Sequence, residues 1–344
     1  MVLDARAWLL WAGAVLVVAS ASRNPIYALL ALAIVVATDS LAGAGVRRGL
    51  PSPLRFALVA VPLAAVFSGL MMPLGATVLV RLPEGWPVVG SAVTLESLLF
   101  GATNGLVLAV IFGGFSVLNR VAPAHDLLRL APRALHEAGM VLTIALTFVP
   151  QTQRSLTRIR EAQALRGHRL RGLRDWLPIT APLLVNGLER SMGLAEAMVA
   201  RGYGAVGERG RPVGVQALWA VGLLGILGGW LGRSFFPAAA TWGAVALAAG
   251  AGLLAAGLWL AGRGVARTRY RPARWGVWEM QAAGGAALTL VAVLAPLPFI
   301  ARGVLDYAPF PRLTPPPVDP FLALAFLGLL VPALLAVAAR RRGT

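Results

Sequence analysis

The sequence predicts an all-α, polytopic membrane protein with about eight transmembrane helices and a helical cytoplasmic region. Of its 344 residues, 58% are hydrophobic, whereas soluble domains average about 45–50%. Only 13% of the residues are charged, and apolar stretches near the ~20 residues needed to cross a bilayer recur along the chain. We therefore expect N-terminal transmembrane helices in 1–120, cytoplasmic helices in 121–212 and C-terminal transmembrane helices in 213–344.

The transmembrane candidates are eight largely uncharged stretches. The first is short, and Arg23-Asn24-Pro25 breaks the chain before the second. The stretches lie near 7–22, 26–43, 55–72, 97–119, 213–233, 238–262, 277–300 and 320–339.

Arginine predicts how these stretches are oriented. The formal net charge is +17, and the chain has no lysine, so every cation is an arginine. Cytoplasmic loops of membrane proteins carry the excess of arginine. If the stretches alternate, both termini are cytoplasmic, and so are the richest clusters: Arg47, Arg48 and Arg55; Arg120, Arg129 and Arg133; Arg263, Arg267, Arg269, Arg271 and Arg274; Arg340, Arg341 and Arg342. The protein is expected in the inner or plasma membrane.

The segment 121–212 does not fit a further crossing. Its apolar stretch 138–150 has only 13 residues between two arginine clusters, so we expect a short helix lying under or dipping into the membrane. Periodic apolar residues then predict an amphipathic helix around 148–159 and a second one after Pro178 and Pro182. The apolar face of the second helix comprises Leu184, Val185, Leu188, Met192, Ala195, Met198 and Val199.

Both amphipathic helices end in the same way. "REAQALRGHR" (160–169) and "AEAMVARGYG" (195–204) each contain Glu-Ala, three residues and then Arg-Gly. Taken alone, Arg-Gly is an ordinary helix ending, because glycine supplies the left-handed cap and arginine complements the helix dipole. The repeated Glu-Ala is not needed for capping. Glu161 to Arg166 and Glu196 to Arg201 are five apart, about 140° around a helix, so neither arginine pairs with its own glutamate. A free guanidinium suits bidentate binding of a carboxylate on another protein.

These residues resemble a known family. Together with "RNPIY" (23–27), "SAVTLESLLFG" (91–101) and "LTIALTFVPQTQRSLTRIREAQALRG" (142–167), the paired endings look like the transmembrane T component of energy-coupling factor (ECF) transporters, the EcfT/CbiQ family. The resemblance covers about 5–262, so the last two transmembrane helices, from about 276, lie beyond it. Leu165 stands where alanine is usual.

The resemblance implies a non-catalytic scaffold of an ABC-type importer of vitamins or transition-metal ions. Segment 121–212 would be its cytoplasmic helical coupling domain, linking two ABC ATPase subunits to a small substrate-binding membrane subunit. The implied docking residues are Leu165, Arg166 and Gly167 with Ala200, Arg201 and Gly202, supported by Glu161, Ala162, Glu196 and Ala197. The partner subunit selects the substrate in this family, so this chain does not identify it.

The composition agrees that ATP is bound elsewhere. A Walker A loop needs a lysine on the phosphates, and the chain has none, so ATP is expected on partner subunits and no cofactor is expected on this chain. We expect membrane lipid as a partner, with Trp275 and Trp278 as interface anchors, and no nucleic acid.

Two other functions are weaker readings of the sequence. A self-contained secondary transporter or channel would need ionisable groups within its spans, and the nearest, Asp39, Glu96 and Glu279, lie close to predicted helix ends. A membrane enzyme would need a catalytic set, and none is visible. There is no cysteine, and His125, His136 and His168 lack a second ligand at metal-site spacing, so no metal site is expected. Glycine-rich runs at 223–232 and 246–257 predict close helix packing.

Overall fold

The computed structural model describes nine segments of the chain, and they divide into two compact units. The first unit comprises Met1–Leu127 with Arg271–Thr344, and the second comprises Leu128–Tyr270. The described segments are 3–42, 51–72, 74–81, 92–168, 172–203, 213–235, 240–263, 275–295 and 300–341.

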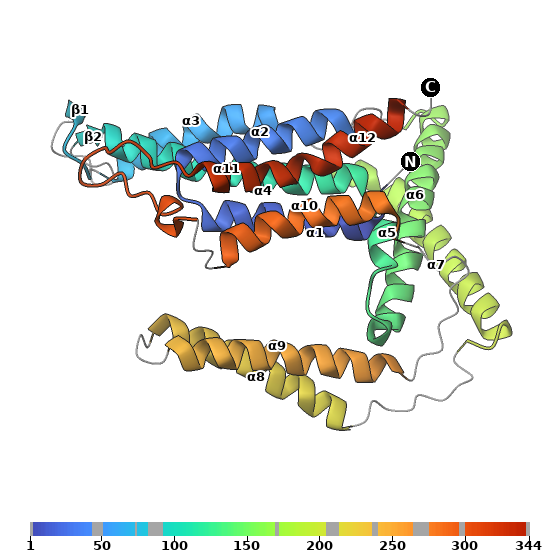
Figure 1. Ribbon diagram of the computed structural model, residues 1–344. Coiled ribbons are helices and arrows are strands. Elements are labelled where there is room, and N and C mark those ends of the chain that lie inside the picture. Colours follow the sequence, from blue (N-terminus) through green and yellow to red (C-terminus); the bar gives the residue numbers. More distant parts are fainter. Residues whose placement is uncertain are drawn as a thin grey trace. The chain divides into compact units, whose positions relative to one another are not determined.

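The first unit is a bundle of long apolar helices with one small hairpin (Figure 1). The hairpin pairs β1 (Val78–Arg81) with β2 (Ala92–Thr94) in an antiparallel ladder. The helices are α1 (Ala5–Ala21), α2 (Pro25–Ala42), α3 (Pro53–Met71), α4 (Leu95–Val121), α5 (Ala124–Leu128) at the unit boundary, α10 (Val277–Leu294), η4 (Arg302–Val304), α11 (Pro320–Phe326), η5 (Leu327–Leu330) and α12 (Val331–Arg341).

Polar caps fix where several of these helices begin. The side chains of Asp4, Ser52, Thr94 and Asp319 each accept a hydrogen bond from a backbone N–H in the first turn of the helix that follows. Such caps satisfy N–H groups that have no partner inside the helix. Proline occupies the first position of α2, α3 and α11, where its missing N–H costs nothing.

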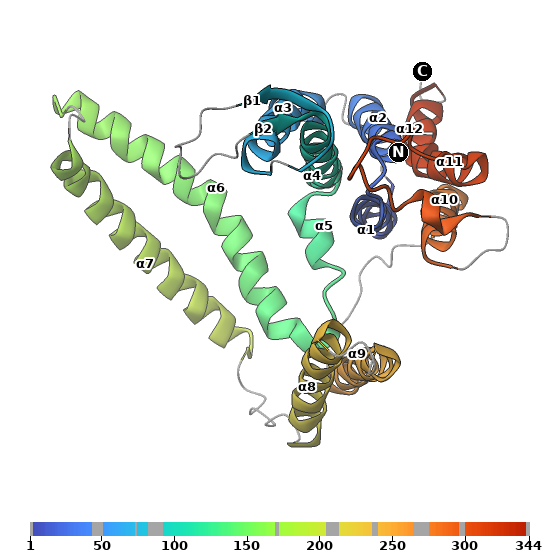
Figure 2. The ribbon, with the colours of Figure 1, turned by 90° about the vertical axis from the view of Figure 1, so that its left-hand side faces the viewer.

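The C-terminal helices complete the core of the first unit. α10 packs against α1, and α12 packs against α2, as seen along the helix axes in Figure 2. The indole of Trp11 is fully buried and donates to the carbonyl of Leu329 at 2.8 Å. The rings of Tyr27 and Phe326 lie 5.2 Å apart. Residues beyond the part that resembles the family are therefore built into the same hydrophobic core as the N-terminal helices.

The second unit contains two helical pairs. η1 (Arg133–Leu135) leads into α6 (His136–Leu165), and η2 (Leu173–Trp176) leads into α7 (Leu177–Ala200). The second pair is α8 (Val213–Phe235) and α9 (Ala240–Arg263).

Two sequence expectations about α6 and α7 were wrong. The stretch 138–150 is not a separate short helix, because α6 runs unbroken through Pro150 for 30 residues. α7 begins before its prolines, with Pro178 in the first turn and Pro182 inside the helix. A proline removes one hydrogen bond and crowds one carbonyl, and α6 nevertheless continues on both sides of Pro150, from His136 to Leu165.

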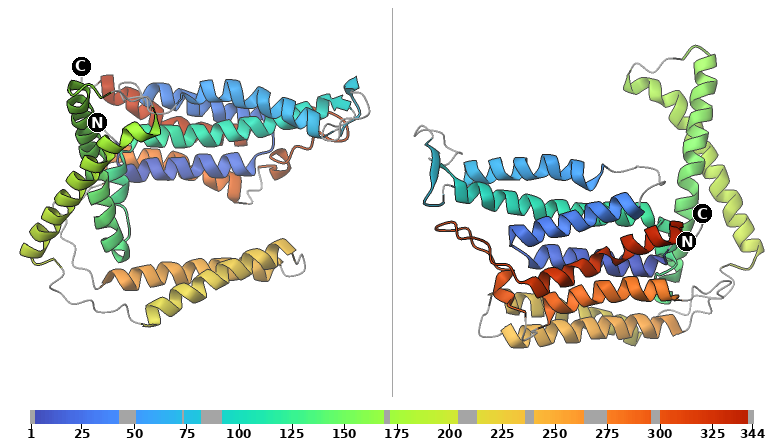
Figure 3. Two further views of the ribbon diagram at one scale, coloured as in Figure 1. Left: turned by 180° about the vertical axis from the view of Figure 1, so that it is seen from behind. Right: turned by 45° about the horizontal axis from the view of Figure 1, so that its top comes forward.

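The glycine-rich runs pack as expected. A Cβ added at Gly250 of α9 would lie 2.7 Å from the carbonyl oxygen of Gly222 in α8, and one at Gly229 would lie 2.7 Å from the backbone of α9. Only glycine allows this approach, and Figure 3 shows α8 and α9 side by side along their length. The packing prediction is confirmed.

The predicted transmembrane stretches are confirmed as helices. Among the described residues, seven helices are long and apolar enough to cross a membrane, and α1 is a shorter apolar helix of 17 residues. The last crossing is α11, η5 and α12 together, Pro320–Ala338. The chain is thus an all-α, multi-pass membrane protein. Its orientation stays a prediction, and Arg47, Arg48, Arg267, Arg269, Arg271, Arg274 and Arg342 lie outside the described residues.

Candidate functional site

The first Arg-Gly motif terminates α6. Arg166 is the capping residue, and Gly167 follows with φ of 78°. The N–H of His168 donates to the carbonyl of Gln163 at 3.0 Å, and the N–H of Gly167 donates to that of Ala164 at 3.0 Å. These two bonds make a Schellman motif, which needs a residue in the left-handed conformation that glycine adopts freely.

The second motif repeats this geometry at the end of α7. Arg201 is the capping residue, and Gly202 has φ of 80°. The N–H of Tyr203 donates to the carbonyl of Met198 at 3.0 Å, and the N–H of Gly202 donates to that of Val199 at 2.9 Å. We call residues 165–168 the first tip and residues 200–203 the second tip. Their backbone hydrogen bonds are equivalent, residue for residue.

Both tips are exposed. Leu165 is 91% exposed, and Ala200, at the equivalent position, is exposed as well. A Cβ added at Gly167 or Gly202 would meet no atom within 4 Å. Within the part of the chain that the structure describes, neither tip is covered.

The arginines of the two tips are available to a partner. Neither Arg166 nor Arg201 forms an ion pair within 4.0 Å with any carboxylate of the described residues. Glu161 and Glu196 are exposed on the same helices, about 140° around the axis from the arginines that follow them. Ala162 and Ala197, next to these glutamates, are exposed too.

The first tip is fastened to the start of α7. Nε2 of His168 lies 2.8 Å from the carbonyl oxygen of Asp175, and the side-chain amide of Gln163 donates to the carbonyl of Pro178 at 3.4 Å. The carboxylate of Asp175 accepts from the N–H of Gly172 at 3.0 Å. These contacts tie the tip to the 3-10 turn that leads into α7, so the first tip has a defined position on the helix pair.

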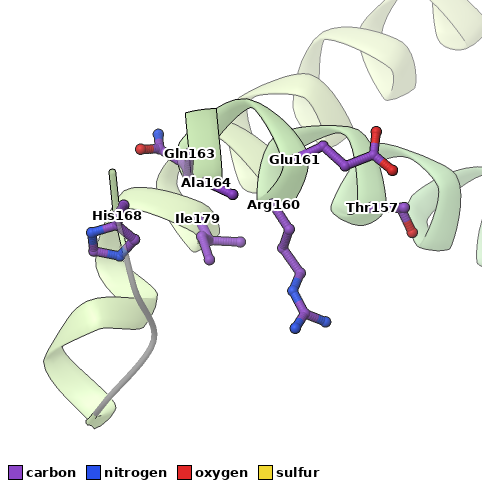
Figure 4. Close-up of a pocket in the computed structure, with 7 residues that line it drawn as sticks. All are labelled: Thr157, Arg160, Glu161, Gln163, Ala164, His168 and Ile179. Atoms are coloured by element: carbon purple, nitrogen blue, oxygen red, sulfur yellow. The ribbon is translucent and has the colours of Figure 1, made fainter. Parts of the chain in front are cut away.

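An open pocket of about 530 Å³ lies beside the first tip. Figure 4 shows Arg160 and Glu161 extending from α6 in different directions, with Ile179 of α7 next to Ala164. Ile179 is only 1% exposed and is the one buried residue of α7. The pocket is lined by Thr157, Arg160, Glu161, Gln163, Ala164, His168 and Ile179.

The two tips are far apart. The first tip adjoins the beginning of α7, and the second tip is its end (Figure 2). α7 has 24 residues, which at 1.5 Å per residue is about 36 Å. The two tips are therefore two separate exposed surfaces.

The apolar face of α7 is uncovered within the described residues. Leu184, Leu188 and Val199 are 73%, 64% and 71% exposed, although the sequence pattern places them on one hydrophobic stripe. A stripe of this kind marks a surface for a protein or a membrane.

The "RNPIY" turn has the opposite character, because it is buried. Asn24 is completely buried and donates to the carbonyls of Val304 at 2.9 Å and Pro317 at 2.8 Å. The hydroxyl of Tyr27 donates to the carbonyl of Asp319 at 2.9 Å and accepts from its N–H at 2.8 Å. This role was not predicted from the sequence. A polar Asn-Pro step between two apolar stretches was the available signal, but it did not reveal that its partners lie some 280 residues away.

The ionisable residues near the spans have structural partners. Asp39 pairs with Arg120 at 2.7 Å, Glu96 accepts from the N–H of Thr77 at 3.0 Å, and Glu279 accepts from that of Gly276 at 3.0 Å. Each carboxylate lies near a helix end, as expected. Asp39 and Glu96 are nevertheless buried, so they hold the first unit together from within.

Two of the three histidines have polar contacts in the structure. His125 lies 3.6 Å from the carboxylate of Asp126, and His168 holds the first tip. Among the described residues, no group of three or more histidine, cysteine, aspartate and glutamate side chains could hold a metal ion.

A family model and several known proteins match parts of this chain. The sequence model of the CbiQ family, described as cobalt transport protein, matches residues 1–212, which include both tips. Several relatives carry the name energy-coupling factor transporter transmembrane protein EcfT. The protein of Streptococcus thermophilus is 38% identical over 90 residues, that of Thermanaerovibrio acidaminovorans 36% over 140 residues, and that of Thermotoga maritima 43% over 74 residues.

These relatives match only in part. The matched regions are 24%, 35% and 20% of this chain, and 33%, 52% and 27% of the respective relatives. The family match is broader and covers well over half of the chain. By its sequence, and with two exposed Arg-Gly helix endings within the matched region, this chain belongs to the CbiQ family.

Proposed function

We propose that this protein is the transmembrane scaffold and energy-coupling subunit of an ECF-type ABC importer. The observation that carries the proposal is the pair of exposed helix tips with equivalent backbone geometry, each presenting an arginine without an ion-pair partner among the described residues. Two equivalent tips suit two ATPase subunits, one at each. Membership of the CbiQ family supports the same assignment.

The tips are built for docking by hydrogen bonds to carboxylates. A guanidinium binds a carboxylate through two parallel N–H···O bonds, which fix orientation as well as distance. The Schellman turn holds the arginine at a defined helix end, and the first tip is fastened to α7 by His168 and Gln163. Movement of a docked ATPase would therefore move α6 and α7 as rigid helices.

The protein has no catalytic role in this proposal. Without lysine it has no standard Walker A loop, so ATP is bound and hydrolysed on the partner ATPases. This chain passes their conformational change to a small substrate-binding membrane subunit. The surface we assign to that subunit is the exposed apolar face of the first half of α7, with Leu184, Val185 and Leu188. The cargo is a vitamin or a transition-metal ion, and the description of the CbiQ family favours cobalt.

The test is a double substitution, R166A/R201A, in the complete transporter. Truncating one partner of a desolvated charge pair costs about 2–5 kcal/mol of binding energy, so we expect the ATPases to be lost on purification and uptake to cease. The matched control is R81A/R312A, which removes two exposed arginines remote from the tips in sequence and should leave both readouts unchanged.

Two results would contradict the proposal. One is normal ATPase retention and uptake by R166A/R201A. The other is substrate uptake by this chain alone in proteoliposomes without ATP, which would indicate a self-contained secondary transporter.

A further inference from the structure

The two tips have the same backbone but differ in charge. Residues 153–168, which end at the first tip, contain four arginines and one glutamate, a formal charge of +3. The equivalent window of α7, residues 188–203, contains two arginines and two glutamates and is formally neutral. The arginines of the first window are Arg154, Arg158, Arg160 and Arg166, and all four are exposed.

The glutamate of the first window does not neutralise these arginines. Glu161 forms no ion pair within 4.0 Å with another described residue, although Arg158 is three positions before it. Its carboxylate and the Arg160 guanidinium extend from α6 in different directions (Figure 4). The first tip thus carries a real excess of positive charge on its surface.

The window that ends at the second tip instead combines a neutral charge with several exposed apolar side chains. Val199 is 71% exposed, Met192 56% and Tyr203 52%. Aromatic and methionine side chains of this kind are enriched in the cores of protein interfaces.

A pocket gives the first tip a further point of contact. Its lining includes the cationic Arg160 and the buried Ile179. A partner could place an apolar side chain against Ile179 and a neighbouring carboxylate against Arg160.

We propose that the two tips are not interchangeable: the first docks a broadly acidic surface of one ATPase subunit, and the second docks a largely apolar surface of the other that offers a single carboxylate to Arg201. This inference rests on the proposed function and adds the chemistry of each docking surface. The cationic cluster of residues Arg154, Arg158 and Arg160 selects its partner by charge complementarity. The second tip selects by shape and apolar contact.

The two sites should therefore respond differently to salt. Raising ionic strength from about 50 mM to about 500 mM shortens the screening length from about 14 Å to about 4 Å. Charge-dependent docking at the first tip is weakened by this change, whereas apolar contact at the second tip is not.

The test uses the absence of cysteine from the chain. A162C and A197C place one cysteine at equivalent, exposed positions four residues before each arginine. Each variant is labelled with benzophenone maleimide in the complete transporter and crosslinked to the ATPases at both salt concentrations. We expect the yield from residue 162 to fall roughly tenfold and that from residue 197 by less than about twofold. Equal changes at the two positions would overturn the inference.

A triple variant tests the cluster directly. R154Q/R158Q/R160Q leaves Arg166 in place, and it should remove most of the salt dependence of crosslinking from residue 162 while lowering the yield at low salt about tenfold. If crosslinking is unchanged and the variant instead loses binding to phosphatidylglycerol vesicles, the cluster binds anionic lipid and the inference is wrong.

Failure of this inference is distinct from failure of the proposed function. If R166A/R201A loses the ATPases but the two crosslinks show the same salt dependence, the chain is the coupling subunit and its tips are equivalent. If R166A/R201A retains the ATPases, the proposed function itself is overturned.

Discussion

The buried α1–α2 turn and the exposed helix tips hold polar side chains in opposite settings. Asn24 is completely buried, and its side chain donates two hydrogen bonds and accepts one from the N–H of Ile26. Arg166 and Arg201 are exposed and have no ion-pair partner among the described residues. A polar group satisfied inside the chain stabilises the fold, whereas a rigidly presented polar group without a partner is available to another protein. Substitutions should therefore separate the two: buried residues control stability, and the tips control assembly.

The largest effect on stability is expected at the Asp39–Arg120 pair. The side chains are 10% and 6% exposed, with 2.7 Å between the charged atoms. D39A leaves the Arg120 charge buried and uncompensated, which costs about 3–5 kcal/mol. Thermal unfolding in detergent measures the loss. D39L/R120M removes both charges, and it should recover most of the stability; failure of that rescue would show that the charges are needed in their own right.

A smaller loss is expected at the α1–α2 turn. N24L leaves the buried carbonyls of Val304 and Pro317 without their donor, so we expect about 2–4 kcal/mol of destabilisation. Y27F, which removes only the hydroxyl that bonds to Asp319, should cost about 1 kcal/mol. Thermal unfolding in detergent ranks the two variants, and ATPase binding by the folded fraction should stay normal. If folded N24L protein binds the ATPases more weakly, the buried turn also affects assembly, and the proposed separation of roles is wrong.

Substitution of the tip glycines should weaken ATPase binding and leave stability nearly unchanged. G167A and G202A place a Cβ in open space but at φ near +80°, a conformation that costs other residues about 1–2 kcal/mol. The exposed turn can relax out of this conformation in the free protein, so the unfolding midpoint should change little. Binding requires the turn, and because the same two hydrogen bonds close both tips, ATPase binding should fall by about 5- to 30-fold in each variant. The control is G193A, at an exposed position away from the ends of α7, and it should not weaken binding. If G167A and G202A lose ATPase binding to different extents, the two tips do not depend equally on this turn.

The smallest effect is expected from Asp319, at the start of α11. Hydrogen bonds from the N–H groups of Ala301 and then Phe321 lower the pKa of this carboxyl. A lowered folded-state pKa stabilises the protein above the unfolded pKa of about 3.9, and the stabilisation is lost as pH falls through the folded value. The unfolding midpoint of the wild type should therefore exceed that of D319N at pH 7 and converge with it below about pH 4. A constant difference across this range would exclude the ionised carboxylate as the cause.

The sequence by itself determined the fold class, the positions of the helices and the two tips. Length and hydropathy identify membrane-crossing helices because a bilayer imposes one thickness on every span. Arg-Gly at a helix end defines a local turn because the left-handed residue and its two hydrogen bonds involve only neighbours in the chain. Such features depend on contacts a few residues apart, which a sequence displays directly.

Only the tertiary structure showed how far α6 extends and which residues far apart in the sequence are in contact. It joined 138–150 to the following helix, because the gain from continuing α6 on both sides outweighs the cost of Pro150. It paired Asp39 with Arg120, 81 positions apart, and Asn24 with carbonyls beyond residue 300. These pairings follow from the burial of polar groups that must find partners wherever packing brings them. No local sequence pattern identifies the hydrogen-bond partner of such a group. Only the packed core shows that the last helices pack against the first.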